Sequence, residues 1–443
     1  MPSRERIPNE IWLEIFRSLP RQALMRVHST HRQFTAISRP LLFTHFTFHP
    51  YLLDIRGYFC AVFYDDIDLE VERLKFWSSE EIAPLVRQCT VAPLECSEAY
   101  ILNSEFVRRI SKFTGLRKLS ATQLDLDSAA LADICALPLL TDLSIVGCEV
   151  EDCDISDMEP LLLRRFFFRG SADRWIPLLD TAFLHELDLT GQLLHKTISA
   201  VSSFPRIHTL TATIDLSTAS AAAFSKFPAV RILKLEKQRR RRSHPEHTAC
   251  PSTSHILPLL NTYIGPHELL PLFLEKPTLK NLILDRCRAE ELCLVLCTEA
   301  PHITSLHATF EHIDSATFET ICTSFPGLVD LFIQRPEFYF PEDHERFYPE
   351  PAEFFSTLAD SPLPRSLQRL AIALKWGELG HFELHSDGSP ISVEGRKKLT
   401  ERCPALTKLR LDGYDFLYTW RRGAGGGGLV QEQSTFGEGK SES

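Results

Sequence analysis

Four side chains able to ligate a metal ion lie close together in one segment: Cys287, Cys293, Cys297 and His302. Cys293 and Cys297 are four residues apart, so on a helix they would share a face. Structural zinc sites usually have tighter and paired spacing, and the chain contains no CxxC pair. A metal site and buried, small hydrophobic side chains are the two interpretations. The spacing favours the second, and we predict no metal and no cofactor.

The motifs of common catalytic chemistries are missing from the sequence. We find no GxSxG, no P-loop, no HExxH and no glycine-rich fingerprint that follows a strand. The run GAGGGG (423–428) precedes no helix and lies in a polar segment, which is typical of a flexible tail. The sequence therefore predicts a protein that is not an enzyme.

Charge and composition limit the partners. The chain of 443 residues is 44% hydrophobic and 24% charged, with a net charge of −10 and a pI near 6.0. This charge argues against nucleic acid and against an anionic membrane, so we expect neither as a partner. No apolar signal core opens the sequence, and the twelve cysteines fit a reducing compartment. We expect a cytoplasmic or nuclear protein, and KQRRRR (237–242) is either a nuclear-localisation patch or a solvated loop.

An apolar pattern, LxxLxL with hydrophobic substitutions, recurs along most of the chain. Its instances start at Leu116, Leu140, Leu163, Leu184, Ile207, Val230, Leu279, Ile303, Leu328, Leu367 and Leu406. The first six starts are 24, 23, 21, 23 and 23 residues apart. The longer gap after Val230 contains a divergent repeat centred near Leu260. The gaps on either side of Leu367 each hold one period and an insertion.

Proline precedes the first apolar position in most repeats, where it ends the preceding helix and lets the chain turn into a strand. Stretches with helical caps lie between the strands, for example DSAALADICAL and DSATFETICTSF. A strand-and-helix unit of this period with LxxLxL is the leucine-rich-repeat signature. We therefore expect an α/β fold: a leucine-rich-repeat solenoid, a horseshoe with parallel strands on its concave face and helices outside.

The alternation of a strand places the residues on either side of the second core leucine on the concave face. These positions include Lys118, Asp142, Arg165, Phe167, Asn281, Ile283, Ser305, His307, Asp330, Phe332, Arg369, Lys408 and Arg410. Arg165 and Arg169, near Phe167, could bind a phosphorylated or acidic segment. For any single position, a solvated scaffold residue is the other interpretation.

The N-terminal stretch IPNEIWLEIFRSLP (7–20) carries more apolar side chains than one buried helix face needs. Read as a helix, it distributes apolar side chains over an arc of about 200°, whereas a surface helix needs little more than ~100°. Three short helices follow one another in this region, and they bury too little surface to fold alone. The first helix should therefore pack inward on its own unit and outward on a partner.

The residues of this region resemble an F-box. Ile7-Pro8, Glu10-Ile11, Ile15-Phe16 and Leu19 are followed by Leu24, Val27, Ser29, Arg32-Gln33-Phe34 and Ile37. The match covers about residues 5–45, with Ile7 in place of the usual leucine and Thr30-His31 beside Arg32. An F-box joined to leucine-rich repeats is an architecture that is abundant in fungi.

The resemblance implies an adaptor of SCF-type cullin–RING ubiquitin ligases, in which the F-box binds the Skp-family linker and the repeats bind a protein substrate. The residues expected to bind the linker are Ile7, Pro8, Ile11, Trp12, Ile15, Phe16, Leu19, Leu24, Val27 and Phe34. The alternative is a leucine-rich-repeat interaction scaffold that does not promote degradation.

The expected domains are an F-box (5–45), a leucine-rich-repeat solenoid (46–415) with degenerate first units, and a disordered tail rich in Gly, Ser and Glu (421–443). Insertions interrupt the solenoid at 238–254, 334–351 and 375–390. Aromatic residues in the last two are either partner anchors or parts of disordered spacers. The candidate substrate-binding residues are Arg165, Phe167, Arg169, His307, Phe332, Phe338, Tyr339, Trp376 and Phe382.

Overall fold

The computed structural model describes most of the repeats and the N-terminal helices. The described residues are 7–48, 64–91, 100–150, 154–155, 158–170, 174–198, 201, 203–214, 221–237, 256–296, 299–310, 313, 315–334, 358–373, 391–412, 416–423 and 429–436. The chain divides into two compact units, Met1–Ile207 and His208–Ser443. Each unit is mixed α/β with a run of strands in one order, and none of the described helices has the length and apolar composition needed to span a bilayer.

Three short helices open the first unit: α1 (Asn9–Arg17), α2 (Arg21–His28) and α3 (Arg32–Leu42). Pro8 and Pro20 each directly precede a helix, where a missing backbone N–H costs nothing. The His31 ring accepts a hydrogen bond from the Gln33 N–H and so caps α3 (3.2 Å). The sequence therefore sets the helix boundaries through two prolines and one polar cap.

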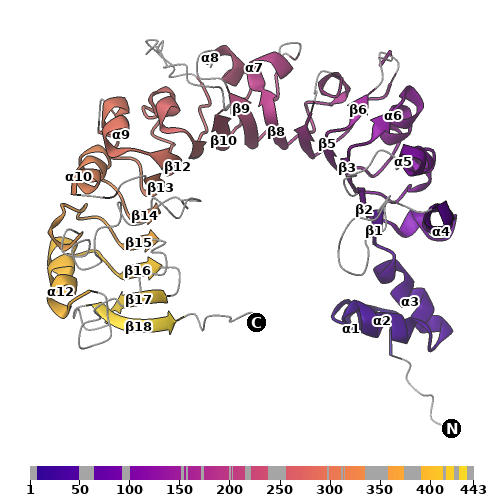
Figure 1. The fold of residues 1–443 in the computed structure, drawn as a ribbon, viewed down its shortest axis with the longest axis horizontal. Helices are drawn as coiled ribbons and strands as arrows, with labels where there is room; N and C mark the ends of the chain where they lie inside the picture. Colours follow the sequence, from indigo (N-terminus) through magenta and orange to yellow (C-terminus); the bar gives the residue numbers. More distant parts are fainter. Residues whose placement is uncertain are drawn as a thin grey trace, which may run out of the picture. The chain divides into compact units, whose positions relative to one another are not determined.

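The rest of the first unit is a parallel run of strands with helices or short 3-10 turns between them (Figure 1). The strands pair in the order β1-β2-β3-β5-β7-β8, and β4 and β6 pair separately. Their bounds are β1 His45–Phe48, β2 Gln88–Val91, β3 Lys118–Thr122, β4 Asp125–Leu126, β5 Asp142–Val146, β6 Glu149–Val150, β7 Arg165–Arg169 and β8 Glu186–Leu193. The helices are α4 Tyr64–Trp77, α5 Tyr100–Val107, α6 Ser128–Cys135 and α7 Leu194–Thr197, and the 3-10 turns are η1 Ala83–Leu85, η3 Ile110–Lys112 and η4 Ile176–Leu178.

The second unit also alternates strands with helices or 3-10 turns, but its last two strand pairs are antiparallel. Strands β9 to β16 are parallel neighbours in chain order, whereas β16–β17 and β17–β18 are antiparallel. The bounds are β9 Thr209–Ile214, β10 Ile232–Lys237, β11 Thr262–Gly265, β12 Asn281–Cys287, β13 Ser305–Phe310, β14 Asp330–Gln334, β15 Arg369–Ala373, β16 Lys408–Asp412, β17 Phe416–Arg422 and β18 Leu429–Phe436. The helices are α8 Ala221–Phe224, α9 Ala289–Val295, α10 Ser315–Ser324 and α12 Val393–Arg402, with the 3-10 turn η5 His267–Leu272.

The helices expected between the strands form where the sequence carries caps. Asp127 accepts a hydrogen bond from the Ala130 N–H at the start of α6 (2.7 Å), and Ser392 accepts one from the Gly395 N–H at the start of α12 (2.9 Å). Each bond satisfies one of the amide groups that a helix N-terminus leaves without a partner.

The repeat register predicted from LxxLxL is confirmed. In β12 to β16 the second core position pairs from strand to strand without a shift: Leu282 with Leu306, then Leu331, Leu370 and Leu409. Leu143, Leu187, Leu282 and Leu409, each the second leucine of its repeat, are 2%, 1%, 1% and 0% exposed. The divergent repeat near Leu260 provides β11, in which Tyr263 takes this place and is fully buried.

A backbone contact recurs where the parallel strands begin. The N–H groups of two consecutive residues donate to one carbonyl of the preceding repeat, as Arg117 and Lys118 do to Arg87 (2.8 and 3.0 Å). The same contact is kept across the two long gaps on either side of Leu367. Gln368 and Arg369 donate to Val329, and Thr407 and Lys408 donate to Gln368. Insertions after a strand therefore leave the pairing of the next strand unchanged.

The N-terminal helices are joined to the strands of their own unit by the same contact. Thr44, just after α3, accepts from the N–H groups of Arg87 and Gln88 (2.8 and 3.0 Å). The Phe43 ring packs edge-on against Trp77 of α4 at 5.4 Å, and Trp77 stacks on Phe46 of β1 at 4.8 Å. Aromatic contacts of this kind stabilise beyond the area that they bury, so the three helices are an extension of the first strands.

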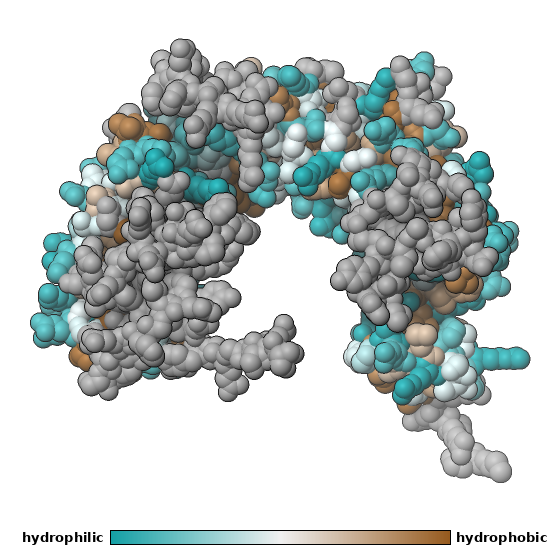
Figure 2. Space-filling view, in the orientation of Figure 1, coloured by the Kyte–Doolittle hydropathy of each residue, from teal (hydrophilic) through white to brown (hydrophobic). Residues whose placement is uncertain are grey.

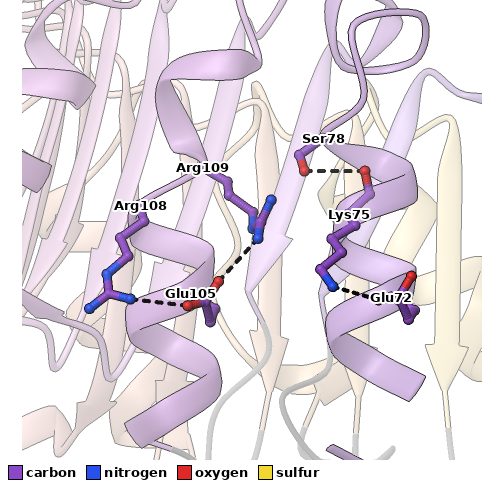
Figure 3. A network of polar contacts seen from close by, with 6 residues as sticks. All are labelled: Glu72, Lys75, Ser78, Glu105, Arg108 and Arg109. Atoms are coloured by element: carbon purple, nitrogen blue, oxygen red, sulfur yellow. Dashed lines mark hydrogen bonds and ion pairs between the residues drawn. The ribbon is translucent and has the colours of Figure 1, made fainter. Parts of the chain in front are cut away.

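Helices α4 and α5 lie side by side, and each carries ion pairs along its own surface (Figure 3). Lys75 pairs with Glu72 at 2.5 Å, and Glu105 pairs with Arg108 at 3.1 Å and Arg109 at 3.2 Å. These pairs are three or four residues apart, which is the spacing of neighbours on a helix, and each contributes only a few tenths of a kcal/mol. Packing of the helices, and not their charges, holds them in place.

The C-terminal segment differs from its prediction. A disordered tail was expected from residue 421, whereas β18 (Leu429–Phe436) pairs antiparallel with β17. Tyr418 and Trp420 of β17 are buried, which gives the sheet an apolar base for one further strand. The insertions at 238–254 and 375–390, and 335–351 of the third, lie outside the described residues.

We predict that Leu282→Ala lowers the free energy of unfolding by about 2–5 kcal/mol, because it opens a cavity at a fully buried position. Asn281→Ala, one residue earlier, should cost about 1 kcal/mol, since it removes only two partly exposed side-chain hydrogen bonds, to Asn261 and Thr262. Denaturant unfolding of both variants measures the difference, and equal losses would contradict the register.

Candidate functional site

Helix α1 has an inward face that fills the core of the three-helix unit. Phe16 is 2% exposed, and its ring packs edge-on against Phe34 at 5.3 Å. The ring centroid of Trp12 lies 4.7 Å from that of Phe34. Leu24 and Leu42 are the other buried members of this cluster, and Leu19, Val27, Ile37, Leu41 and Phe43 pack against it.

The opposite side of α1 is apolar and exposed. Ile11 and Ile15, one helical turn apart, are 51% and 41% exposed, and Ile7, just before the helix, is 47% exposed. We call these three residues the α1 outer face. Met25 of α2 is also exposed, at 56%. Figure 2 shows hydrophobic residues at the surface of the part of the chain that carries α1 to α3.

The residues expected to bind a linker therefore divide into two groups. Ile7, Pro8, Ile11 and Ile15 are exposed, and linker binding by them stays a prediction. Trp12, Leu19, Val27 and Phe34 are half-buried. For Phe16 and Leu24 the structure corrects the expectation of direct contact, because both side chains are enclosed by the unit itself. They belong to the core on which α1 packs.

A second candidate surface is a groove of about 560 Å³ on the strands of the second unit. It is lined by Thr262, Asn281, Ile283, Ser305, Leu306, His307, Asp330, Leu331, Phe332, Arg369, Leu370, Ala371, Lys408 and Arg410. We call it the β11–β16 groove. Its exposed and half-buried side chains alternate with the buried leucines along each strand, as expected for the open face of a sheet.

Pairing brings the groove side chains together in two rows. Asp330, Arg369 and Lys408 pair across β14, β15 and β16 in one row. His307, Phe332, Ala371 and Arg410 pair across β13 to β16 in the other. These residues are up to 103 positions apart in the sequence, so only the register makes them neighbours.

Ion pairs orient two of the arginines. Arg369 donates from Nε and Nη2 to the two carboxylate oxygens of Asp330, a bidentate arrangement. Arg410 donates from Nη2 to Asp412 at 2.6 Å. A guanidinium has five N–H donors, so both arginines keep donors for a ligand.

His307 and Phe332, both predicted as substrate-binding residues, form an edge-to-face pair with ring centroids 4.1 Å apart. Partial burial lowers the pKa of His307, against the opposing effects of a hydrogen bond to Gln334 and of Asp285. The ring is therefore neutral at pH 7, and it adds shape and hydrogen-bonding capacity to the groove without adding charge.

The first-unit candidates lie together on β7. Arg165, Phe167 and Arg169 point to one face, because the residues between them, Phe166 and Phe168, are buried. Arg165 forms an ion pair with Asp142 of β5, and Phe167 is half-buried. The four remaining candidates, Phe338, Tyr339, Trp376 and Phe382, lie outside the described residues.

The cysteines of the possible metal segment are not gathered. Cys287 is buried at the end of β12, where burial raises the pKa of its thiol to about 12, whereas Cys293 is exposed on α9. Within the described part of the chain, which omits Cys297, no three potential ligands come together. A protonated, buried thiol behaves as a small hydrophobic side chain.

Sequence reasoning placed Arg369, Lys408 and Arg410 on the open strand face but did not select them as candidates. The signal that identifies them is the register: their strands are neighbours, although insertions separate them in the sequence. Counting positions from the second leucine of each repeat places all three on the same open face as Phe332.

No family model matches the chain, and no curated protein matches it. Among solved structures, the chain is similar to TLR13, a leucine-rich-repeat protein, in a crystal structure of the TLR13–ssRNA13 complex. The identity is 14%, the TM-score is 0.33, and the match covers 74% of this chain and 46% of that one. The chain thus spans less than half the length of that protein, and at this TM-score the likeness carries no argument about function.

One expectation from the sequence is corrected, because the charge of the whole chain does not decide it. The net charge led us to exclude nucleic acid as a partner, but the similar structure is a complex with single-stranded RNA. The charge of a whole chain averages over faces of opposite sign, as the cationic end of the β11–β16 groove illustrates. The exclusion of nucleic acid is therefore withdrawn.

We predict that substitutions on the two faces of α1 change the stability of the three-helix unit by different amounts. Phe16→Ala should destabilise the three-helix unit by about 3–5 kcal/mol, the cost of removing a buried aromatic ring. Ile11→Ala should change stability by no more than about 0.5 kcal/mol, because its side chain is half exposed. Amide hydrogen exchange of α1 to α3 in the full chain measures both, and similar loss of protection would contradict the division of α1 into two faces.

Proposed function

We propose that this protein is the substrate-recognition adaptor of an SCF-type cullin–RING ubiquitin ligase. In this proposal α1 to α3 are an F-box that binds a Skp-family linker. The strands belong to a leucine-rich-repeat solenoid of the horseshoe type that binds a protein substrate. The adaptor is not itself catalytic, because the ligation chemistry belongs to other subunits.

The α1 outer face is the observation that carries the proposal. The core of the three helices is formed by Phe16, Leu24 and Leu42 with the side chains packed around them, and Ile7, Ile11 and Ile15 are not among its members. Exposed apolar side chains grouped on one side of a helix are typical of a surface that a partner covers. Their position within the F-box-like residues 5–45 indicates the Skp-family linker as that partner.

The attachment of the helices to the strands also supports an adaptor. Thr44 and Phe43 connect α3 to β2 and α4 by backbone hydrogen bonds and ring contacts. The Arg39 side chain forms an ion pair with Glu81, at the turn before β2. An adaptor must hold its two binding parts on one framework, and these contacts make the helices continuous with the first strands.

The test is co-expression of the full chain with a Skp-family linker and a cullin, followed by affinity purification. The wild-type chain should retain both proteins. The double variant Ile11→Ala/Ile15→Ala should lose the linker by at least tenfold, because interface anchors of this kind cost about 2 kcal/mol or more. Its melting temperature should match that of the wild type.

Leu294→Ala provides the matched control, since Leu294 is an apolar side chain on α9 that is 74% exposed. This variant should retain the linker fully. A wild-type chain that retains no linker would overturn the F-box assignment. Retention of the linker without the cullin would replace the ligase adaptor by an interaction scaffold.

A further inference from the structure

The β11–β16 groove has a notch at Ala371. The paired row runs His307, Phe332, Ala371, Arg410, so the smallest side chain lies between an aromatic ring and a long cation. Neighbouring strands are about 4.8 Å apart, which places the Cα atoms of Phe332 and Arg410 roughly 10 Å from each other. That distance leaves room above Ala371 for one side chain of a ligand.

Cations border this notch on the side of β15 and β16. Lys408 pairs with Arg369 in the neighbouring row, and Arg410 lies two residues beyond Lys408 on the same strand. Among the described residues that line the groove, three cationic side chains face one carboxylate, that of Asp330. Asp412, just outside the lining, pairs with Arg410, so the local net charge is +1 with His307 neutral. The notch therefore attracts an anion at one end and an apolar group at the other.

We infer that the β11–β16 groove binds a protein segment in which a glutamate or aspartate is next to an apolar side chain. The carboxylate is held by Lys408 and by the remaining donors of Arg369 and Arg410, and the apolar side chain lies on Ala371 against Phe332. This inference deepens the proposed function and rests on it, because it names the class of substrate segment that the adaptor would select.

The observations favour a peptide carboxylate over a nucleic acid. Single-stranded RNA is usually bound by several aromatic platforms on which successive bases stack. Phe332 is the one aromatic ring besides His307 in the described lining, and the two rings are perpendicular, so they do not form successive parallel platforms. Asp330 and Asp412 beside the cations also oppose a chain of closely spaced phosphates.

The test measures binding to the full chain by fluorescence polarisation at physiological salt. The probe is a short fluorescein-labelled peptide that alternates glutamate with leucine. The comparison probes are the same peptide with glutamine, the same peptide with phosphoserine, and a single-stranded RNA oligonucleotide. We expect the glutamate peptide to bind at least tenfold more tightly than the glutamine peptide, a difference of about 1.4 kcal/mol, and more tightly than the other two probes.

Two variants locate the site. Lys408→Gln/Arg410→Gln should weaken the glutamate peptide about tenfold and leave the glutamine peptide unchanged. Ala371→Leu should fill the notch and weaken both peptides. The matched controls lie at the same repeat positions in the first unit: Lys118→Gln and Ser144→Leu should bind as the wild type does.

Other outcomes would overturn the inference. These are tighter binding of RNA or of the phosphoserine peptide, equal binding of the glutamate and glutamine peptides, or an affinity that none of the groove variants changes. Its failure is distinguishable from failure of the proposed function, because the groove variants should still retain the linker. Conversely, Ile11→Ala/Ile15→Ala should still bind the glutamate peptide.

Discussion

The fold depends on one backbone contact, in which two consecutive N–H groups at the start of a strand share a carbonyl of the preceding repeat. This contact sets the register, and the register decides which side chains are buried. A shift by one residue would turn the row of Leu282, Leu306 and Leu331 to the open face and bury Asn281 and Asp330 instead. No repeat can bury its leucines alone, so each strand is stable only because its neighbour is in phase.

This constraint leaves the rest of each repeat free to vary. Tyr263 replaces leucine in the divergent repeat, and its hydroxyl is satisfied by the Pro266 carbonyl (2.7 Å), so a polar group is buried without disturbing the pairing. Insertions after β14 and β15 are tolerated for the same reason, since the next strand again starts at the shared carbonyl. The open-face positions lie outside the buried leucine row, so their side chains can vary without changing the register.

The sequence predicts these repeats well, because each strand carries a buried leucine at the same position and this gives a strong periodic signal. It predicts less about α1, since an apolar arc of about 200° is wider than one buried face needs but does not say which residues face inward. Phe16 belongs to the core because Phe34 of α3 packs against it, and this tertiary contact cannot be read from the pattern of α1 alone. Strand β18 was missed because its polar residues depend on pairing with β17 and carry little signal of their own.

The two candidate surfaces are energetically separate. The α1 outer face lies outside every strand pair, and the side chains of the β11–β16 groove lie outside the leucine row, so neither surface carries the stability of the fold. Binding at either one can therefore change by substitution without unfolding the chain. The chemistry of the open face can therefore vary from repeat to repeat while the leucine row keeps the register.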